Sequence, residues 1–289
     1  MITQTDNDKL YRYLFQQRAV RGEWVRLNQT FIDTLNTHQY PEVVQNLLGE
    51  MMVATSLLTA TLKFQGNITV QIQGDGPLKL ALVNGNEQQQ MRGLARLQGE
   101  VQNTMSLTEL VGKAVLVITI APEKGERYQG VIPLDKPTIA ECLADYFIRS
   151  EQLKTQLFIR VGQFNDKPVA AGMLLQIMPD GLGLAEDFEH LATLTETIKD
   201  EEIFALNAET LLYRLYHEEK VEIYPPQQLS FHCGCSLDRS GAALLLMPDD
   251  DIAQLLEEHH GSIDMQCECC GTHYFFNETT IAQLKTKSA

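Results

Sequence analysis

Five of the six cysteines lie within 38 residues near the end of the sequence. They form the pattern Cys233-Gly-Cys235, a gap of 31 residues, and Cys267-Glu-Cys269-Cys270. Two close thiol pairs joined by a loop can supply the four sulfurs of a tetrahedral metal site, for which zinc is the natural occupant. In the second half we assign Cys267 and Cys270, because a two-residue spacing followed by glycine suits a metal-binding turn. We therefore expect one zinc ion bound by Cys233, Cys235, Cys267 and Cys270.

The same segment contains other groups that bind metals. Four histidines lie near the cysteines in the sequence: His232, His259, His260 and His273. One of them could replace a cysteine in a three-sulfur site, and otherwise we expect them on the surface. The adjacent thiol of Cys269 is expected to point away from the ion.

The sixth cysteine, Cys142, lies among apolar residues with helical spacing, and we expect it to be a small buried side chain rather than a reactive thiol. The sequence shows no nucleophile with a partner base and no nucleotide-binding loop. We therefore expect neither an enzyme nor an ATP-driven cycle.

The negative charge is confined to the second part of the chain. Residues 1–179 carry 17 basic and 17 acidic side chains, whereas residues 180–289 carry 6 basic and 21 acidic ones, so the latter hold the whole net charge of −15. Acidic surfaces repel phosphate backbones, which argues against a nucleic-acid partner. The sequence shows no secretory signal and no predicted membrane span, so we expect a cytoplasmic protein whose thiols are reduced and available to a metal.

The cysteine-rich segment, residues 229–289, is predicted to be a small zinc-binding domain. A helix capped by Asp249 or Asp250 should end at Gly261, short strands should cover 263–265 and 274–276, and Asn277 should cap a last helix. About 60 residues make a marginal core, so such a domain usually needs a metal or disulfides. We expect it to unfold when the ion is removed.

The body, residues 1–179, is predicted to have an α+β fold with an antiparallel sheet. The stretch from Pro41 to Leu62 is apolar on most faces and should form a buried helix. Alternating residues on either side of a Gly-Asp-Gly-Pro turn predict a hairpin over 68–82. A second helix is predicted over 138–153, and further strands over 91–97, 114–120, 127–132, 157–161 and 170–178.

Residues 180–228 are predicted to be an acidic helical linker, after a boundary marked by proline and glycines at 178–183. Apolar residues recur at helical spacing and form a stripe: Phe188, Leu191, Leu194, Ile198, Phe204, Leu211, Leu212 and Leu215. Such helices cannot bury their apolar faces alone, so we expect them to dock on a neighbouring part of the protein.

Beyond the cysteines, several stretches of the sequence are similar to one known family. They are AVRGE (19–23), ATSLLTATLKF (54–64), QGDGP (73–77), YQGV (128–131), DYFIRSEQL (145–153), AAGMLLQ (170–176), HLATLTETI (190–198) and LLYRLYHEE (211–219). Together with the cysteine pattern they resemble the thirty-three kilodalton heat-shock protein family of redox-regulated holdase chaperones, and the likeness covers almost the whole chain.

The resemblance implies a chaperone that is inactive when reduced and zinc-bound and that oxidation activates. It implies the zinc ligands assigned above, disulfides Cys233 to Cys235 and Cys267 to Cys270 in the active form, unfolded client proteins as partners, and dimerisation on activation. Cys269 departs from the family pattern, which leaves the partner in the second disulfide open.

The residues support this role on chemical grounds. Thiolates are the form of cysteine that peroxide attacks, and an oxidised sulfur is a poor ligand, so oxidation should free the zinc and unfold the domain. The linker helices would then expose the stripe from Phe188 to Leu215 to clients. The rival interpretation from the residues alone is an adaptor whose zinc is purely structural, since most four-cysteine zinc sites are structural.

Overall fold

The computed structural model describes residues 6–16, 18–61, 65–178 and 185–288. The chain divides into two compact units, Met1–Phe231 and His232–Ala289. The mixture of antiparallel sheets and helices confirms the predicted α+β class. The first unit includes the acidic helical segment as well as the body. The predicted boundaries of that segment at 179 and 228 stay a prediction. Residues 179–184, where we expected the first boundary, lie outside the described residues.

The first sheet of the first unit follows the order β10-β1-β2-β9-β8, with β11 also pairing with β1. Every pairing in it is antiparallel. Its strands are β1 (Lys9–Phe15), β2 (Val20–Leu27), β8 (Thr155–Phe164), β9 (Lys167–Ile177), β10 (Val221–Ile223) and β11 (Gln227–Gln228). The sequence predicted β8 and β9 but neither β1 nor β2. In β2 three charged residues, Arg21, Glu23 and Arg26, interrupt the apolar ones, and the alternation changes phase between Trp24 and Val25.

The second sheet follows the order β12-β5-β4-β3-β6-β7 and is antiparallel except for the short parallel pair β12–β5. Its strands are β3 (Gly66–Gly74), β4 (Leu78–Asn86), β5 (Gln90–Leu97), β6 (Ala114–Pro122), β7 (Tyr128–Pro133) and β12 (Ser230–Phe231). The predicted hairpin is confirmed as β3–β4, whose register runs from Asn67 opposite Asn86 to Gln73 opposite Leu80. The predicted strands at 91–97, 114–120 and 127–132 are confirmed as β5, β6 and β7.

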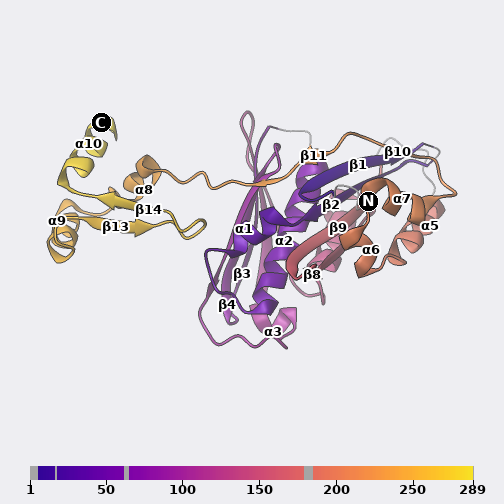
Figure 1. Ribbon diagram of the computed structural model, residues 1–289, viewed down its shortest axis with the longest axis horizontal. Helices are drawn as coiled ribbons and strands as arrows, with labels where there is room; N and C mark the ends of the chain where they lie inside the picture. Colours follow the sequence, from indigo (N-terminus) through magenta and orange to yellow (C-terminus); the bar gives the residue numbers. More distant parts are fainter. Residues whose placement is uncertain (1–5, 17, 62–64, 179–184, 289) are drawn as a thin grey trace. The chain divides into compact units, whose positions relative to one another are not determined.

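Helix α2 (Glu42–Thr61) lies between the two sheets and forms the centre of the main core (Figure 1). The helix predicted from Pro41 is therefore confirmed, while its predicted last residue, Leu62, lies outside the described residues. By length and composition α2 could cross a membrane, but 72% of that stretch is buried inside the protein, as expected for a core helix. Its apolar character on all sides follows from contact with a sheet on each side.

Three smaller helical elements complete this core. Helix α1 (Gln29–Leu35) begins where the carboxylate of Asp8 accepts hydrogen bonds from the backbone N–H groups of residues 28–30. Helix α3 (Leu107–Val111) carries a capping box formed by Ser106 and Glu109. The helix predicted over 138–153 is present as α4 (Ile139–Tyr146), which continues into the π-helical turn η1 (Phe147–Glu151).

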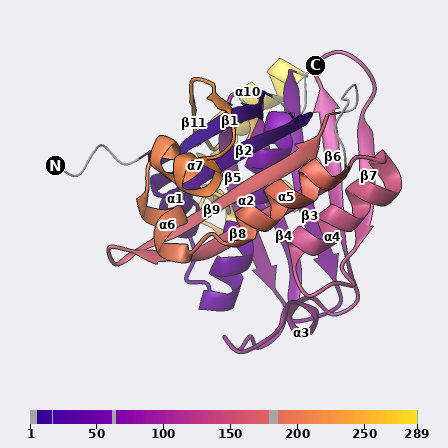
Figure 2. The same cartoon turned by 90° about the vertical axis from the view of Figure 1, so that its right-hand side faces the viewer.

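The opposite face of the first sheet is covered by the acidic segment (Figure 2). It forms α5 (Ala185–Glu196), α6 (Asp200–Ala205) and α7 (Ala208–Tyr216). Asn207 caps α7 as predicted, accepting a 2.8 Å hydrogen bond from the N–H of Thr210. The prediction that these helices dock on a neighbouring part of the protein is confirmed.

The second unit contains α8 (Leu237–Leu244), α9 (Asp249–Glu258), the hairpin β13 (Ile263–Gln266) and β14 (His273–Phe276), and α10 (Glu278–Ser288). The predicted strands and the Asn277 cap are confirmed, the latter by a 2.9 Å hydrogen bond from the N–H of Thr280. The predicted cap at Asp249 or Asp250 is wrong: both lie in the first turn of α9, after Pro248, where their charges favour the helix dipole. The buried core of the second unit is small and consists of Leu244, Ile252, Leu256, Ile263, Phe276, Ile281 and Leu284.

Candidate metal centre

Four cysteine sulfurs gather at one point of the second unit. The Sγ atoms of Cys233, Cys235, Cys267 and Cys270 all lie within 4.8 Å of one another. The shortest contacts cross between the two halves of the motif, at 3.6 Å between Cys233 and Cys267 and 3.4 Å between Cys235 and Cys270. A tetrahedral ion with metal–sulfur bonds of ~2.3 Å holds its sulfurs ~3.8 Å apart, so this donor set fits a zinc-sized ion. The structure therefore brings together the four residues that the sequence singled out.

The second half of the motif is a tight turn that aims two sulfurs at the same side. The N–H of Gly271 donates to the carbonyl of Cys267 at 2.8 Å, and the N–H of Cys267 donates to the carbonyl of Thr272 at 2.9 Å. Gly271 adopts φ +72°, a conformation that residues with a Cβ rarely take. The glycine after the last cysteine thus has the role that the spacing indicated.

The first half of the motif is held by the start of α8. Ser236 caps this helix through a 3.2 Å hydrogen bond from the N–H of Arg239. The Arg239 guanidinium in turn donates to the carbonyl of Gly234 at 2.6 Å, which fixes the residue between Cys233 and Cys235. The two thiol pairs are therefore positioned by local structure on either side of the sequence gap.

The sulfurs do not share the same acidity. Burial raises the pKa of Cys270, but hydrogen bonds with Thr272 and Cys235 outweigh it and bring the pKa down to about 6. Burial raises the pKa of Cys235 to about 12 and also raises that of Cys267. Thiolates this close repel one another, so the four thiols cannot all ionise without a cation. Cys270 loses its proton first, and its negative charge keeps the other thiols protonated. A bound cation would stabilise thiolates at all four positions.

The neighbouring metal-binding groups are placed elsewhere. Cys269 is 8% exposed and lies outside the four-sulfur group. His273 approaches the carboxylate of Asp264 at 2.9 Å through Nδ1 and stacks on Phe275. Within the described part of the chain, the ligand atoms that meet at this centre come from the four cysteines alone. Cys142 is buried in the main core, as predicted, and burial raises its pKa.

The apolar stripe of the acidic segment lies against the first sheet. Seven of its eight residues are buried and Leu194 is partly buried, all in one cluster with side chains of the sheet. The sheet side of this cluster includes Tyr13, Phe15, Val20, Trp24, Phe158, Val169, Met173 and Leu175. The stripe is therefore covered in this conformation, and its exposure would require the helices to leave the sheet.

A buried arginine that the sequence did not single out ties this segment to the sheet. Arg26 in β2 is 0% exposed, and its Nη1 donates to the carbonyls of Phe204 and Leu206 at 2.9 and 2.8 Å. These carbonyls belong to the end of α6, where backbone acceptors have no partner within the helix. Burial lowers the pKa of Arg26, and the nearby Asp6 carboxylate opposes that shift. The sequence carried no local signal for this role, because the carbonyls that Arg26 binds lie 178 and 180 residues further along the chain.

Ion pairs at the rim of the apolar cluster also contact the acidic segment. Arg18 pairs with Asp187 and with Glu219, the latter at 2.8 Å, and His190 also approaches Glu219 at 3.1 Å. Hydrogen bonds from Arg18 lower the pKa of Glu219 and outweigh its partial burial. Because these groups are partly exposed, each pair adds little stability, and the apolar cluster supplies most of the docking energy.

Comparison with known proteins places the whole chain in one group. The family model described as Hsp33 protein matches residues 8–277. The 33 kDa chaperonin of Pasteurella multocida is 75% identical over 287 residues, which are 99% of this chain and 100% of that protein. The 33 kDa chaperonin of Mannheimia succiniciproducens is 76% identical over 280 residues, covering 97% of this chain and 95% of that protein.

A solved structure shares the fold. The crystal structure of the 33 kDa chaperonin from Thermotoga maritima superposes with a TM-score of 0.82, covering 97% of this chain and 99% of that one. The two sequences are 22% identical, so the match concerns the fold. The family model and the two relatives confirm the family resemblance seen in the sequence, and the solved structure confirms the fold.

Proposed function

This chain belongs to the Hsp33 family, and from that premise we propose that it is a redox-regulated holdase chaperone, which binds unfolding proteins and prevents their aggregation under oxidative stress. The observation that carries the proposal is the meeting of four thiols within 4.8 Å in a unit with a small core. An acidic segment whose apolar stripe is covered only by docking supports it. The partners are then unfolded or partly unfolded proteins, and the reduced form is the inactive one.

The resting state is proposed to hold one zinc ion on Cys233, Cys235, Cys267 and Cys270. When bound, zinc would keep the four sulfurs as thiolates, which is the form that oxidants attack. Attack of one thiolate on hydrogen peroxide gives a sulfenic acid and hydroxide. A neighbouring thiol then displaces water from the sulfenic acid, so two electrons pass from a sulfur pair to the peroxide as a disulfide forms.

We assign the disulfides Cys233 to Cys235 and Cys267 to Cys270 on the family resemblance. Each joins cysteines in the same half of the motif, whereas the shortest contacts of the reduced form cross between the halves. Peptide mapping of the oxidised protein distinguishes the two pairings. A disulfide from Cys269 would show instead that the extra thiol takes part.

Pairing of the sulfurs removes the cross-link that holds the second unit. Seven buried apolar residues form its core, which is small for a unit of this size. Metal binding contributes ~10–16 kcal/mol in small zinc peptides, comparable to the stability of a whole domain at ~5–15 kcal/mol. Loss of the ligand set should therefore unfold residues 232–289.

The next step is release of the acidic segment from the first sheet. Its helices are short and contribute little stability of their own, so they stay folded through docking. We propose that unfolding of the second unit destabilises this docking and that client proteins bind the exposed stripe Phe188, Leu191, Leu194, Ile198, Phe204, Leu211, Leu212 and Leu215. The acidic residues beside it would keep the opened form soluble.

The activated form is proposed to be a homodimer that acts in the cytoplasm without ATP, membrane or nucleic acid. These features follow from the family resemblance and from the charge and motifs of the sequence. Activity here is binding rather than catalysis, so a peroxidase-like turnover is not expected.

The test is to treat the reduced, zinc-loaded protein with peroxide and mild heat and to follow the aggregation of a denatured client by light scattering. The proposal predicts zinc release followed by suppression of aggregation. Equal suppression by the reduced form would contradict it. Retention of the metal under oxidant would favour a structural-zinc adaptor, and peroxide turnover without accumulation of oxidised protein would favour an enzyme.

A further inference from the structure

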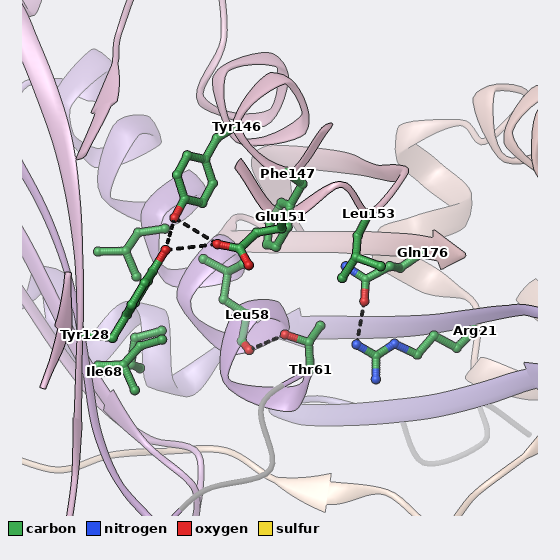
Figure 3. A pocket seen from close by; sticks show the side chains of 12 residues that line it. Arg21, Leu58, Thr61, Ile68, Tyr128, Tyr146, Phe147, Glu151, Leu153 and Gln176 are labelled. Carbon is green, nitrogen blue, oxygen red and sulfur yellow. Dashed lines mark hydrogen bonds between the residues drawn. The ribbon is translucent and has the colours of Figure 1, made fainter. Parts of the chain in front are cut away.

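Five of the family-like stretches lie outside both the metal centre and the acidic segment, and each of them contributes side chains to one pocket of the first unit. The pocket has a volume of about 320 Å³ and opens between the two sheets (Figure 3). Stretches 19–23, 54–64, 128–131, 145–153 and 170–176 all line it. They contribute Arg21, Leu58, Thr61, Tyr128, Tyr146, Phe147, Glu151, Leu153 and Gln176.

The inner wall of the pocket is apolar. Leu58 comes from the last turns of α2, Ile68 from β3 and Phe147 from the π-helical turn. Ile118 and Ile120 of β6 complete this wall. A cavity of this size with such a lining suits a compact apolar group rather than an ion.

One side of the mouth is polar and rigidly built. The hydroxyls of Tyr128 and Tyr146 are 2.5 Å apart and lie 2.9 and 3.1 Å from Oε1 of Glu151, so two hydroxyl protons serve three short contacts and Glu151 accepts (Figure 3). The Tyr146 ring packs over Gly130, where an added Cβ would meet its hydroxyl at 2.6 Å. Burial, followed by the hydrogen bond with Tyr128, raises the pKa of Tyr146, so this hydroxyl keeps its proton.

The other polar group is Arg21. Its Nη2 donates to Oε1 of Gln176 at 2.5 Å, and its buried Nε has no hydrogen-bond partner among the residues that the structure describes. Arg21 and Glu151 bear opposite charges, so the pocket favours neither an anion nor a cation. It favours a neutral group that offers an acceptor to the guanidinium and a donor to the carboxylate. A peptide unit has both.

Strand β7 runs beside the mouth and is an edge of the second sheet, paired with β6 alone among the described strands. Tyr128 and Val131 of this strand are exposed apolar residues. An extended segment lying along such an edge presents alternate side chains to the pocket. We propose that the pocket binds one bulky apolar side chain of an extended client segment, with the peptide unit of that residue held between Arg21 and Glu151.

This inference rests on the proposed chaperone function but differs from it in one measurable way. Every described residue that lines the pocket precedes residue 179, so none of them comes from the docked helices or the metal centre. Binding of a single apolar side chain there should therefore be the same in the reduced and the oxidised protein. Oxidation would expose the stripe as a second client-binding surface beside the pocket. A client bound at both surfaces would dissociate more slowly than one bound at the pocket alone.

The experiment uses the full-length protein and a short Gly/Ser peptide with one central p-benzoylphenylalanine, followed by irradiation and mapping of the adducts. The proposal predicts adducts within residues 118–120 and 146–153 in both redox states. A Gly/Ser peptide with phenylalanine at the same position should compete, and one with serine should not. Free phenylalanine as competitor distinguishes an amino-acid site from a peptide site: competition equal to that of the peptide would overturn the proposal.

Two variants provide a matched pair. Leu153→Trp fills the pocket, and we expect peptide affinity at least about tenfold weaker. Ile148→Trp adds the same side chain nearby at a residue that is 53% exposed and does not line the pocket, and it should bind as the native protein does. Adducts found only within 185–216, or only after oxidation, would overturn the pocket even if aggregation is suppressed. Adducts in the pocket, together with no suppression of client aggregation by the oxidised form, would contradict the proposed function and still support the pocket.

Discussion

Truncation of a single buried residue in the docked stripe should activate the protein without oxidant. Leu211 lies in α7, is 0% exposed and packs in the cluster between the acidic helices and the first sheet. Replacing a fully buried leucine by alanine typically costs ~2–5 kcal/mol. Because Leu211 lies outside the main core around α2, this loss should fall mainly on the docking of α5–α7.

The expected size of the effect follows from that cost. A loss of ~2 kcal/mol shifts the equilibrium between docked and released helices by about 30-fold. The shift should appear as faster amide hydrogen exchange in α5, α6 and α7 of the reduced, zinc-loaded Leu211→Ala protein, with exchange in α2 unchanged. Aggregation of a denatured client should then be suppressed without peroxide.

Tyr213→Ala is the matched control, because Tyr213 lies on the same helix but is 72% exposed. It should exchange and suppress aggregation as the native reduced protein does. If Leu211→Ala released the helices without binding client, the stripe would not be the client surface. If it left exchange unchanged, the docking energy would not come from this cluster.

Four further outcomes are expected. Arg26→Met leaves the carbonyls of Phe204 and Leu206 without their donor, at ~1–3 kcal/mol for each buried unpaired group, and should speed hydrogen exchange at the end of α6. Glu23, which is 2% exposed, has its pKa raised by burial to about 7 from the model-compound value of 4.5, so the folded state binds more protons and stability should fall as pH rises from about 4.5 to 7. Glu23→Gln should remove the share of Glu23 in that slope and stabilise the protein at pH 8 by about 3 kcal/mol in urea titrations, while Glu50, whose pKa burial also raises to about 7, keeps its own share; an unchanged slope would contradict the assignment. Metal removal by a chelator under reducing conditions should unfold residues 232–289 and leave the main core intact, as seen in exchange protection of α2 and α9. Cys269→Ser should keep full metal content, whereas Cys270→Ser should lose it, and equal losses would show that Cys269 is a ligand.

The metal centre could be predicted from the sequence because its information is local. Two short cysteine motifs, with Gly271 after the second, specify the local turns. The segment between them needs only to bring the two motifs together. The buried helix α2 and the β3–β4 hairpin were also visible, since a long apolar stretch and strict alternation each indicate one structure. The sequence likewise identified the acidic stripe and required that it dock.

Non-local features could not be predicted in this way. Strand β2 is buried on both faces, one against α2 and one against the acidic helices, and its alternation of polar and apolar residues changes phase between Trp24 and Val25, so no single apolar face marks it. The role of Arg26 depends on carbonyls 178 and 180 residues further along the chain. The pocket between the sheets collects residues from seven separate segments of the described chain, and only the fold brings them together.

The most direct test of the central claim follows metal content, thiol count and client binding in one sample during oxidation. The account predicts that one equivalent of zinc and the thiols of Cys233, Cys235, Cys267 and Cys270 are lost together, and that the protein begins to hold client only after this loss. Client binding that precedes the loss of metal, or complete sulfur pairing that leaves the acidic helices protected from exchange, would contradict it.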